Sequence, residues 1–253
     1  MNQTAAGALL AVRSVSKRYA ETIALQDVSI DFGRSSIHTV LGENGSGKST
    51  LVKLLSGITS WDSGEILLEG KRLEGGGPGN FLALGFATVF QEVLVTPDRD
   101  VVDNVLLGID EMFRFHIPRG ERAARVAAVM RRIARTRISL TELVGNLPLA
   151  QRQLIVIARA LVREPRVLIL DEATAALDHA DRDAVFAEVE ERARAGCLVL
   201  FISHRMHEVL RLSERISVLR SGQLVATLAH GEATADDLLA LMAPAKLVEP
   251  ADG

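Results

Sequence analysis

The chain has 253 residues, of which 48% are hydrophobic and 24% charged, and its net charge is −3. This composition excludes a disordered chain, which buries too little apolar surface to offset its ordering entropy. The acidic balance also argues against a nucleic-acid-binding protein, which usually carries a basic excess. A single cysteine, Cys197, excludes an internal disulfide and fits a reducing compartment.

The first third of the chain predicts strands around one glycine-rich loop. Alternating or continuous apolar residues predict strands at 9–15, 23–32, 37–41, 64–69 and 84–90. The glycine-rich loop 42–47 leads into a predicted helix over 48–57. Residues 74–80 hold four glycines and a proline, and we interpret them as a surface loop.

The middle of the chain is predicted to be helical, from residue 101 to about 162. Within it, residues 119–137 carry seven arginines and one glutamate, and place apolar residues on one helix face. We interpret the arginines as a solvated face rather than a nucleic-acid or lipid site, because no aromatic residues are interspersed among them.

The last third returns to alternating elements. Strands are predicted at 167–170, 198–202, 215–219 and 224–228, the last two as a hairpin across Ser221-Gly222, and helices at 181–195, 206–212 and 234–242. Such alternation predicts a mostly parallel sheet covered on both faces. The fold class is therefore α/β, with the middle helices inserted as a subdomain.

The motif with the clearest chemistry is a phosphate-binding loop. It fits G-x-x-x-x-G-K-[ST] without a mismatch, in the order Gly42, Glu43, Asn44, Gly45, Ser46, Gly47, Lys48, Ser49. Glycines let backbone N–H groups curl around phosphate oxygens, and the following helix N-terminus adds a positive dipole. Lysine at this position reaches the β- and γ-phosphates, and the Ser49 hydroxyl takes Mg²⁺.

Two further sites follow predicted strands. The apolar run 167–170 leads into Asp171 and Glu172, so the acids lie at the edge where α/β sheets place ligands. Asp171 is suited to Mg²⁺ and Glu172 to polarising the attacking water. His204 follows the strand at 198–202, where a histidine can hydrogen-bond a γ-phosphate.

Other phosphate-loop classes fit less well. A GTPase needs an [NT]-K-x-D guanine reader, and none of the five lysines has aspartate two residues later. A small-molecule kinase usually has no histidine at the end of a late strand. The order of these motifs resembles instead the nucleotide-binding subunit of ABC transporters, over almost the whole chain.

This resemblance implies roles for further residues. Tyr19 would stack on adenine, and Gln91 would touch Mg²⁺ and face a membrane partner, so that Ser49, Gln91 and Asp171 form the metal set. Glu172 would be the catalytic base and His204 the switch histidine, acting with Gln91. The remaining nucleotide contacts would come from the phosphate loop, Thr50 and Asp178 of the segment Ala175-Ala176-Leu177-Asp178.

The resemblance is closest to the N-terminal cassette of ribose/xylose/galactose-type sugar importers, carried by Phe90-Gln91-Glu92 and by the run 201–209, which reads Phe-Ile-Ser-His-Arg-Met-His-Glu-Val. It implies one nucleotide-binding domain over 1–253. Its RecA-like and antiparallel β core would span about 7–91 and 164–243, its helical subdomain about 92–163, and a tail or linker 244–253. That family commonly fuses two such domains, and this chain holds one.

One motif departs from the family rule. The ABC signature is L-S-G-G-Q, and this chain has Leu147, Pro148, Leu149, Ala150 and Gln151. Pro148 has neither a hydroxyl nor a backbone N–H, and Leu149 puts a bulky side chain where backbone must approach phosphate. The signature half of a composite site is therefore impaired, while the phosphate-loop half is intact.

Together these features predict an ATP-hydrolysing subunit of an importer, most simply for a monosaccharide, with ATP and Mg²⁺ as cofactors. The expected partners are integral-membrane permease subunits, a second cassette that is non-identical or fused, and indirectly a periplasmic binding protein; nucleic acid is not expected. No apolar run is long enough for a membrane helix, and residues 1–10 lack the order of a signal peptide. We therefore expect peripheral attachment to the cytoplasmic face of the inner membrane.

Two alternatives stay open at this point. A soluble ABC ATPase acting on DNA or ribosomes would usually carry long coiled-coil insertions or a second cassette with a basic linker, and neither is present. A weakly hydrolysing regulatory cassette is favoured by the signature and opposed by Glu172 and His204. The identity of the solute is not encoded here, since specificity in such systems lies in other subunits.

Overall fold

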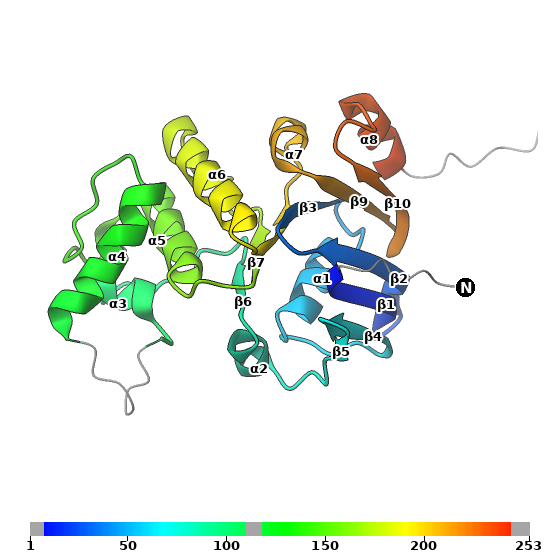
Figure 1. The fold of residues 1–253 in the computed structure, drawn as a ribbon, viewed down its shortest axis with the longest axis horizontal. Coiled ribbons are helices and arrows are strands. Elements are labelled where there is room, and N and C mark those ends of the chain that lie inside the picture. Colours follow the sequence, from blue (N-terminus) through cyan, green and yellow to red (C-terminus); the bar gives the residue numbers. More distant parts are fainter. Residues whose placement is uncertain (1–7, 110–117, 244–253) are drawn as a thin grey trace, which may run out of the picture.

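The computed structural model describes residues 8–109 and 118–243. Figure 1 shows helices at one end, an antiparallel sheet at the other and a six-stranded sheet between them. The predicted tail at 244–253 lies outside the described residues. Along the described part, no helix combines the length and apolar character needed to cross a membrane.

The six-stranded sheet has the order β10-β9-β3-β8-β7-β6. Its inner strands are parallel, and only β10 runs antiparallel, to β9. This arrangement confirms the predicted α/β class. The strands span Ser36–Leu41 (β3), Phe86–Val89 (β6), Val167–Asp171 (β7), Leu198–Ile202 (β8), Arg215–Arg220 (β9) and Gln223–Ala229 (β10).

A second, antiparallel sheet has the order β2-β1-β4-β5. It contains the first two strands and the short pair that follows the phosphate-loop helix: Ala8–Tyr19 (β1), Thr22–Gly33 (β2), Ser63–Leu68 (β4) and Lys71–Arg72 (β5). Alternate residues such as Leu10, Val12 and Ile66 are buried. These side chains pack in a core that this sheet shares with β3, β7 and β8 of the central sheet.

The two faces of the central sheet enter different cores, because side chains alternate along a strand. In β7, Val167 and Ile169 pack with β1, β2 and α1 (Lys48–Leu55). Leu168 and Leu170 pack instead with the helices on the opposite face. Cys197 is buried in that second core, as expected.

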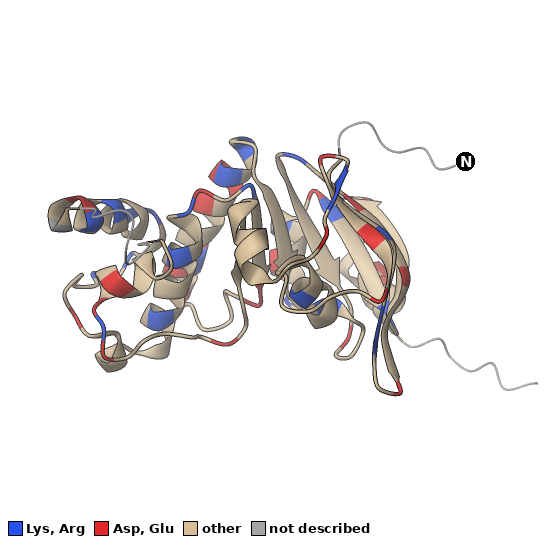
Figure 2. Ribbon diagram, turned by 90° about the horizontal axis from the view of Figure 1, so that it is seen from below, with Lys and Arg blue, Asp and Glu red and all other residues tan. Residues whose placement is uncertain are grey.

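In the described part of the chain between β6 and β7, which omits 110–117, three helices occur: Val101–Leu106 (α3), Arg119–Ile133 (α4) and Leu149–Leu161 (α5), with a short 3₁₀ turn at Val144–Asn146 (η1). Asp100 caps α3 by accepting from the Asp103 N–H. The apolar stripe of α4, including Val126 and Ile133, is buried. Figure 2 shows basic and acidic residues mixed over much of the molecule, whereas the charged residues of α4 are mostly basic.

The remaining helices cover the face of the central sheet that lies opposite α1, and the edge formed by β9 and β10. His179–Arg194 (α6) packs with α5 in the larger core, while Met206–Leu212 (α7) and Ala235–Met242 (α8) pack near β9. Thr234 and Asp237 form a capping box at α8.

One sequence prediction is wrong in part. Residues 74–80 were expected to form a loop throughout, but Pro78–Ala83 forms a short helix, α2. Proline is favoured in the first helical turn, where its missing N–H is not needed. Phe81 is buried and packs edge-on against Phe86, with ring centroids 5.2 Å apart. This tertiary contact outweighs the glycine-rich composition.

Candidate functional site

A cavity of about 900 Å³ lies where β3, β6, β7 and β8 end. Parallel strands of α/β sheets present their ligand sites at this edge. The cavity brings together most of the predicted site residues. Its lining comprises Thr22, Ile23, Ala24, Gly42, Glu43, Asn44, Gly45, Gly47, Lys48, Ser49, Thr50, Gln91, Asp171, Glu172, His204 and Met242.

The phosphate loop connects β3 to α1, and two of its glycines cannot be replaced by a residue with a side chain. A Cβ on Gly42 would lie 2.3 Å from the Leu219 carbonyl oxygen. Gly47 has φ +106°, and a Cβ there would lie 2.7 Å from the Ala24 carbonyl oxygen. Side chains rarely adopt this left-handed backbone. Gly47 is also the N-cap of α1, so the loop delivers its N–H groups to the cavity.

Lys48 crosses the mouth of this loop. Its Nζ donates to the carbonyl oxygens of Gly42 at 2.7 Å and Glu43 at 2.9 Å. Burial lowers the pKa of Lys48, and the nearby charges of Glu172 and Asp171 oppose that shift. The Lys48 side chain is thus partly desolvated and lies close to two acidic side chains. Such a group is suited to binding phosphate, which would supply further negative charge.

A distant turn holds the loop in place. The Gly222 N–H donates to the Ser46 carbonyl at 3.0 Å, and the Gln26 N–H donates to the Gly222 carbonyl at 2.8 Å. Gly222 therefore ties the phosphate loop to β2. The sequence predicted only a hairpin turn here, because a hydrogen bond between residues so far apart in the chain leaves no local pattern.

Asp171 and Glu172 follow one another at the end of β7 but differ in setting. Asp171 is buried, and its pKa is raised, first by burial and next by the charge of Glu172. Glu172 has φ +49°, a left-handed conformation that is uncommon for a residue with a side chain. Its N–H donates to the Ile202 carbonyl at 2.9 Å, which ties β7 to the end of β8.

His204 lies beside Glu172, with 3.2 Å between His204 Nδ1 and Glu172 Oε1. The histidine side chain is 61% exposed and the glutamate 19%, so the pair faces the cavity from its open side. The loop after β8 and the turn after β7 thus bring a histidine and a carboxylate into contact at the cavity that the phosphate loop also lines.

The residues predicted to hold Mg²⁺ also share the cavity. Ser49, Gln91 and Asp171 supply a hydroxyl, an amide and one carboxylate. Mg²⁺ is usually held by oxygen atoms from one or two carboxylates together with phosphates and water. No cluster of three His, Cys, Asp or Glu side chains suited to a metal occurs in residues 8–109 and 118–243. This donor set therefore fits a cation that arrives with a nucleotide.

Other predicted residues lie away from this cavity lining. Tyr19 is 42% exposed at the end of β1, and its strand neighbour Thr22 lines the cavity in its place. Asp178 caps α6, accepting from the Asp181 N–H at 2.9 Å. Sequence reasoning missed Thr22 and Met242, since neither belongs to a motif.

The signature segment also lies outside the cavity lining, at the start of α5. Pro148 is the N-cap of this helix, and Leu149 is 59% exposed in its first turn. Arg152 holds the segment by donating to the carbonyls of Leu147 and Gly145, both at 2.7 Å. The segment is thus rigid and presents an apolar side chain to solvent.

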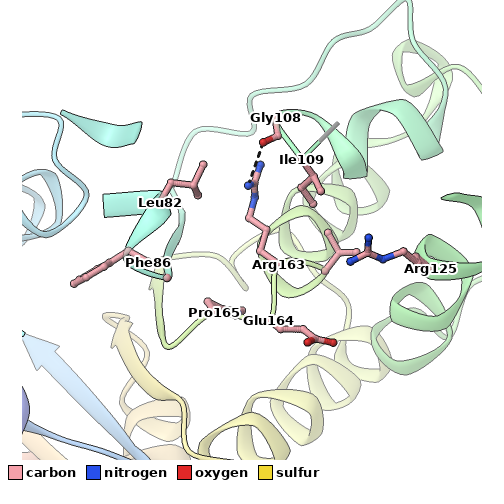
Figure 3. A pocket seen from close by; sticks show the side chains of 10 residues that line it. Leu82, Phe86, Gly108, Ile109, Arg125, Arg163, Glu164 and Pro165 are labelled. Carbon is pink, nitrogen blue, oxygen red and sulfur yellow. Dashed lines mark hydrogen bonds between the residues drawn. The ribbon is translucent and has the colours of Figure 1, made fainter. Parts of the chain in front are cut away.

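A second cavity, of about 340 Å³, lies toward the opposite edge of the sheet, next to Phe86 and Pro165. Figure 3 shows Arg163 extending across it, where the guanidinium donates to the Gly108 carbonyl at 3.4 Å. Neither the phosphate loop nor the two acids contribute to its lining. The predicted phosphate-loop and acidic residues therefore line the larger cavity and not this one.

A family description reading "ABC transporter" matches residues 25–175, a span that holds the phosphate loop, Asp171 and Glu172. The chain belongs to the ABC transporter family. The cassette is 38% identical over 235 residues to ribose import ATP-binding protein RbsA 1 of Rhizobium johnstonii, covering 92% of the cassette and 46% of that protein. It is 37% identical over 234 residues to RbsA of Yersinia pestis, again covering 92% and 46%.

Solved ABC cassettes share the fold. One ATP-binding cassette of an ABC transporter superposes with a TM-score of 0.81 at 24% identity, over 94% of this cassette and 99% of that chain. CbiO1 of Clostridium perfringens, described as part of the transporter complex cbiONQ, gives 0.77 at 26% identity, over 92% and 93%. The cassette spans about half the length of the curated relatives it matches.

Proposed function

We propose that this cassette binds and hydrolyses ATP to drive an importer, and that the imported solute is a monosaccharide. The observation that carries the proposal is the cavity that gathers Lys48, Asp171, Glu172 and His204 at one sheet edge. The names of the RbsA relatives, ribose import ATP-binding proteins, support a sugar as the solute.

The residues divide the work of phosphoryl transfer to water. The backbone N–H groups of the loop and the Lys48 ammonium bind the phosphates. Ser49, Gln91 and Asp171 would hold Mg²⁺, which would supply positive charge to offset the charge that develops on the phosphates. Glu172 orients the attacking water and accepts its proton. His204 donates a hydrogen bond to a γ-phosphate oxygen. Its contact with Glu172 keeps the two side chains in a fixed relative position.

A second cassette completes the site. The exposed first turn of α5 supports a contact with another subunit, since Leu149 is 59% exposed although the helix is otherwise well buried. Two copies of this chain would pair each phosphate loop with Pro148 and Leu149, which lack the hydroxyl and the close backbone contact. We therefore propose a non-identical or fused partner cassette that carries an intact signature, with Tyr19 and Asp178 approaching nucleotide only in that closed pair.

A membrane partner docks, in this proposal, on an apolar groove beside Gln91. A cavity of about 280 Å³ is lined by Phe90, Leu94 and Arg159. Leu94 is 63% exposed, and the neighbouring Leu82 is 40% exposed. Exposed apolar side chains gathered around a hollow mark an interaction surface. Docking of a permease here would place the cassette at the cytoplasmic face of the inner membrane, with a periplasmic binding protein acting indirectly.

The impaired signature favours one alternative, a weakly hydrolysing regulatory cassette. Such a subunit would bind ATP through the intact phosphate loop but turn it over slowly. The proximity of Glu172 to His204 opposes this alternative, because a purely regulatory subunit has no need of a reacting pair.

The test combines binding and turnover. Lys48→Ala should abolish most ATP binding in a calorimetric titration, because the phosphates lose their main point charge. Lys71→Ala, an exposed lysine of β5 outside the cavity, is the matched control and should bind ATP normally. Equal affinities in the two variants would contradict the proposed nucleotide site. Co-purification with an integral-membrane protein separates transport from a soluble role.

A further inference from the structure

A fully buried carboxylate lies directly behind the reacting pair. Glu208, in the first turn of α7, is 0% exposed. Buried carboxylates are rare unless they are paired and hydrogen-bonded. The mechanism proposed above does not use this residue, and the sequence resemblance assigns it no role.

Glu208 accepts hydrogen bonds from two different loops. Its Oε2 accepts from the Thr174 hydroxyl at 3.0 Å and from the Ser203 hydroxyl at 3.0 Å. Thr174 lies two residues after Glu172, and Ser203 lies immediately before His204. One carboxylate oxygen therefore joins the turn that carries the glutamate to the loop that carries the histidine.

Arginines complete the connection. The other oxygen, Oε1, lies 3.4 Å from Arg205 Nη1 and 3.9 Å from Arg182 Nη1. Arg205 follows His204 directly, and its Nη2 donates to the Ala175 carbonyl at 3.1 Å. His204 is thus anchored on both sides, while its own side chain is mostly exposed.

From these contacts we propose that Glu208 is a positioning residue for ATP hydrolysis, which keeps Glu172 and His204 in contact by fixing the loops on either side of them. The proposal rests on the proposed ATPase function of the same site. Glu208 is not among the residues that line the cavity. It acts through the 3.2 Å contact between the two reacting side chains.

A purely structural role makes a different prediction, and the fold offers a matched residue. Glu188 in α6 is also buried, at 3%, and pairs with Arg192 at 2.7 Å and Arg132 at 3.4 Å. Its partners belong to α6 and α4 and hold no part of the nucleotide cavity. Removal of either carboxylate takes a salt-bridge partner from two arginines, but only removal of Glu208 frees the two reacting loops.

The experiment compares Glu208→Ala, Glu208→Gln and Glu188→Ala in the full chain. Three quantities are measured: the dissociation constant of ATP with Mg²⁺, kcat, and the NMR signal of the His204 imidazole, assigned with His204→Gln. For Glu208→Ala we expect kcat to fall about 10–100-fold, since small misplacements of reacting groups are costly. We expect ATP affinity to stay unchanged, because the phosphate loop is untouched.

The conservative variant and the imidazole signal separate positioning from stability. In Glu208→Gln the amide oxygen still accepts both hydroxyls, so turnover should recover in part. The His204 signal in Glu208→Ala should move toward its position in Glu172→Ala. Glu188→Ala should lower the unfolding midpoint while leaving kcat and the His204 signal as in the wild type.

Several outcomes would overturn the proposal. A wild-type kcat and His204 signal in Glu208→Ala would do so, as would an equal loss of kcat in Glu188→Ala. If Glu208→Ala does not fold, Ser203→Ala removes one of the two hydroxyl bonds and should lower kcat about two- to tenfold. If the wild-type chain alone hydrolyses no ATP, the His204 signal decides whether Glu208 positions the pair. If the wild-type chain also binds no ATP with Mg²⁺, the proposed function fails.

Discussion

Gly222 offers a direct test of how the phosphate loop is supported. The residue has φ +77°, and alanine in this left-handed region costs about 1–2 kcal/mol. The added Cβ would also lie 2.9 Å from the Ala24 carbonyl oxygen and 3.3 Å from Leu25 Cα. Both contacts are with backbone, so the chain itself must move. Overpacking of this kind costs a further ~1–3 kcal/mol.

The displaced backbone is the one that supports the nucleotide. The Ala24 carbonyl lies between Gly222 and Gly47, since a Cβ on Gly47 would lie 2.7 Å from the same oxygen. Movement of Ala24 is therefore transmitted to the phosphate loop from one side, and the Gly222–Ser46 hydrogen bond weakens on the other. We expect ATP affinity to fall about tenfold in Gly222→Ala, which corresponds to ~1.4 kcal/mol.

Gly70 supplies the control for backbone strain. It has φ +75°, and a Cβ there would meet no atom within 4 Å. Gly70→Ala therefore has the same free-energy cost of placing alanine in a left-handed backbone conformation, but it creates no steric contact. ATP titrations and denaturant unfolding of both variants separate the two effects. If Gly222→Ala binds ATP as tightly as Gly70→Ala, the turn does not support the loop and the reasoning is wrong.

Three further predictions concern the reacting groups and the buried thiol. Glu172→Gln should keep ATP affinity and lower kcat by at least ~10²-fold, measured in single-turnover assays, because an amide cannot accept the proton. Pro148→Ser with Leu149→Gly should raise the ATPase rate of the chain alone about 10²–10³-fold, and an unchanged rate would show that the signature defect is harmless. Burial raises the pKa of Cys197 to about 11. Between pH 9 and 11 the Cys197 thiol is therefore protonated in the folded state and deprotonated in the unfolded state. The free energy of unfolding should fall by up to ~2 kcal/mol as the pH rises through this range. The Cys197→Ala variant, which lacks the thiol, should not show this part of the decrease.

The strands and the chemical motifs were predictable because both depend on local sequence. An apolar run as short as 167–170 predicts a buried strand, because four residues are too few for a typical helix. The phosphate loop is recognised by the fixed spacing of its glycines and lysine. Helix α2 was missed because the burial of Phe81 against Phe86 is a tertiary effect that glycine content does not report.

The supports of the site were not predictable for the same reason. The Gly222–Ser46 bond requires β9 to pair with β3, across more than 170 residues of sequence. Glu208 is, in the sequence, one charged residue in the first turn of a short helix, and only the fold encloses it between two loops. Local patterns thus identify the reacting groups, whereas long-range pairing determines what holds them.

The left-handed backbone of Glu172 has a consequence for engineering. At φ +49° the position is one that glycine occupies more easily than glutamate. A library selected only for thermal tolerance would therefore be drawn toward Glu172→Gly, which relaxes the turn and removes the proton acceptor at once. Such a selection would yield variants that are thermally stable and bind ATP but do not hydrolyse it. Residue 172 should therefore be kept as glutamate in any screen that does not also measure ATP hydrolysis.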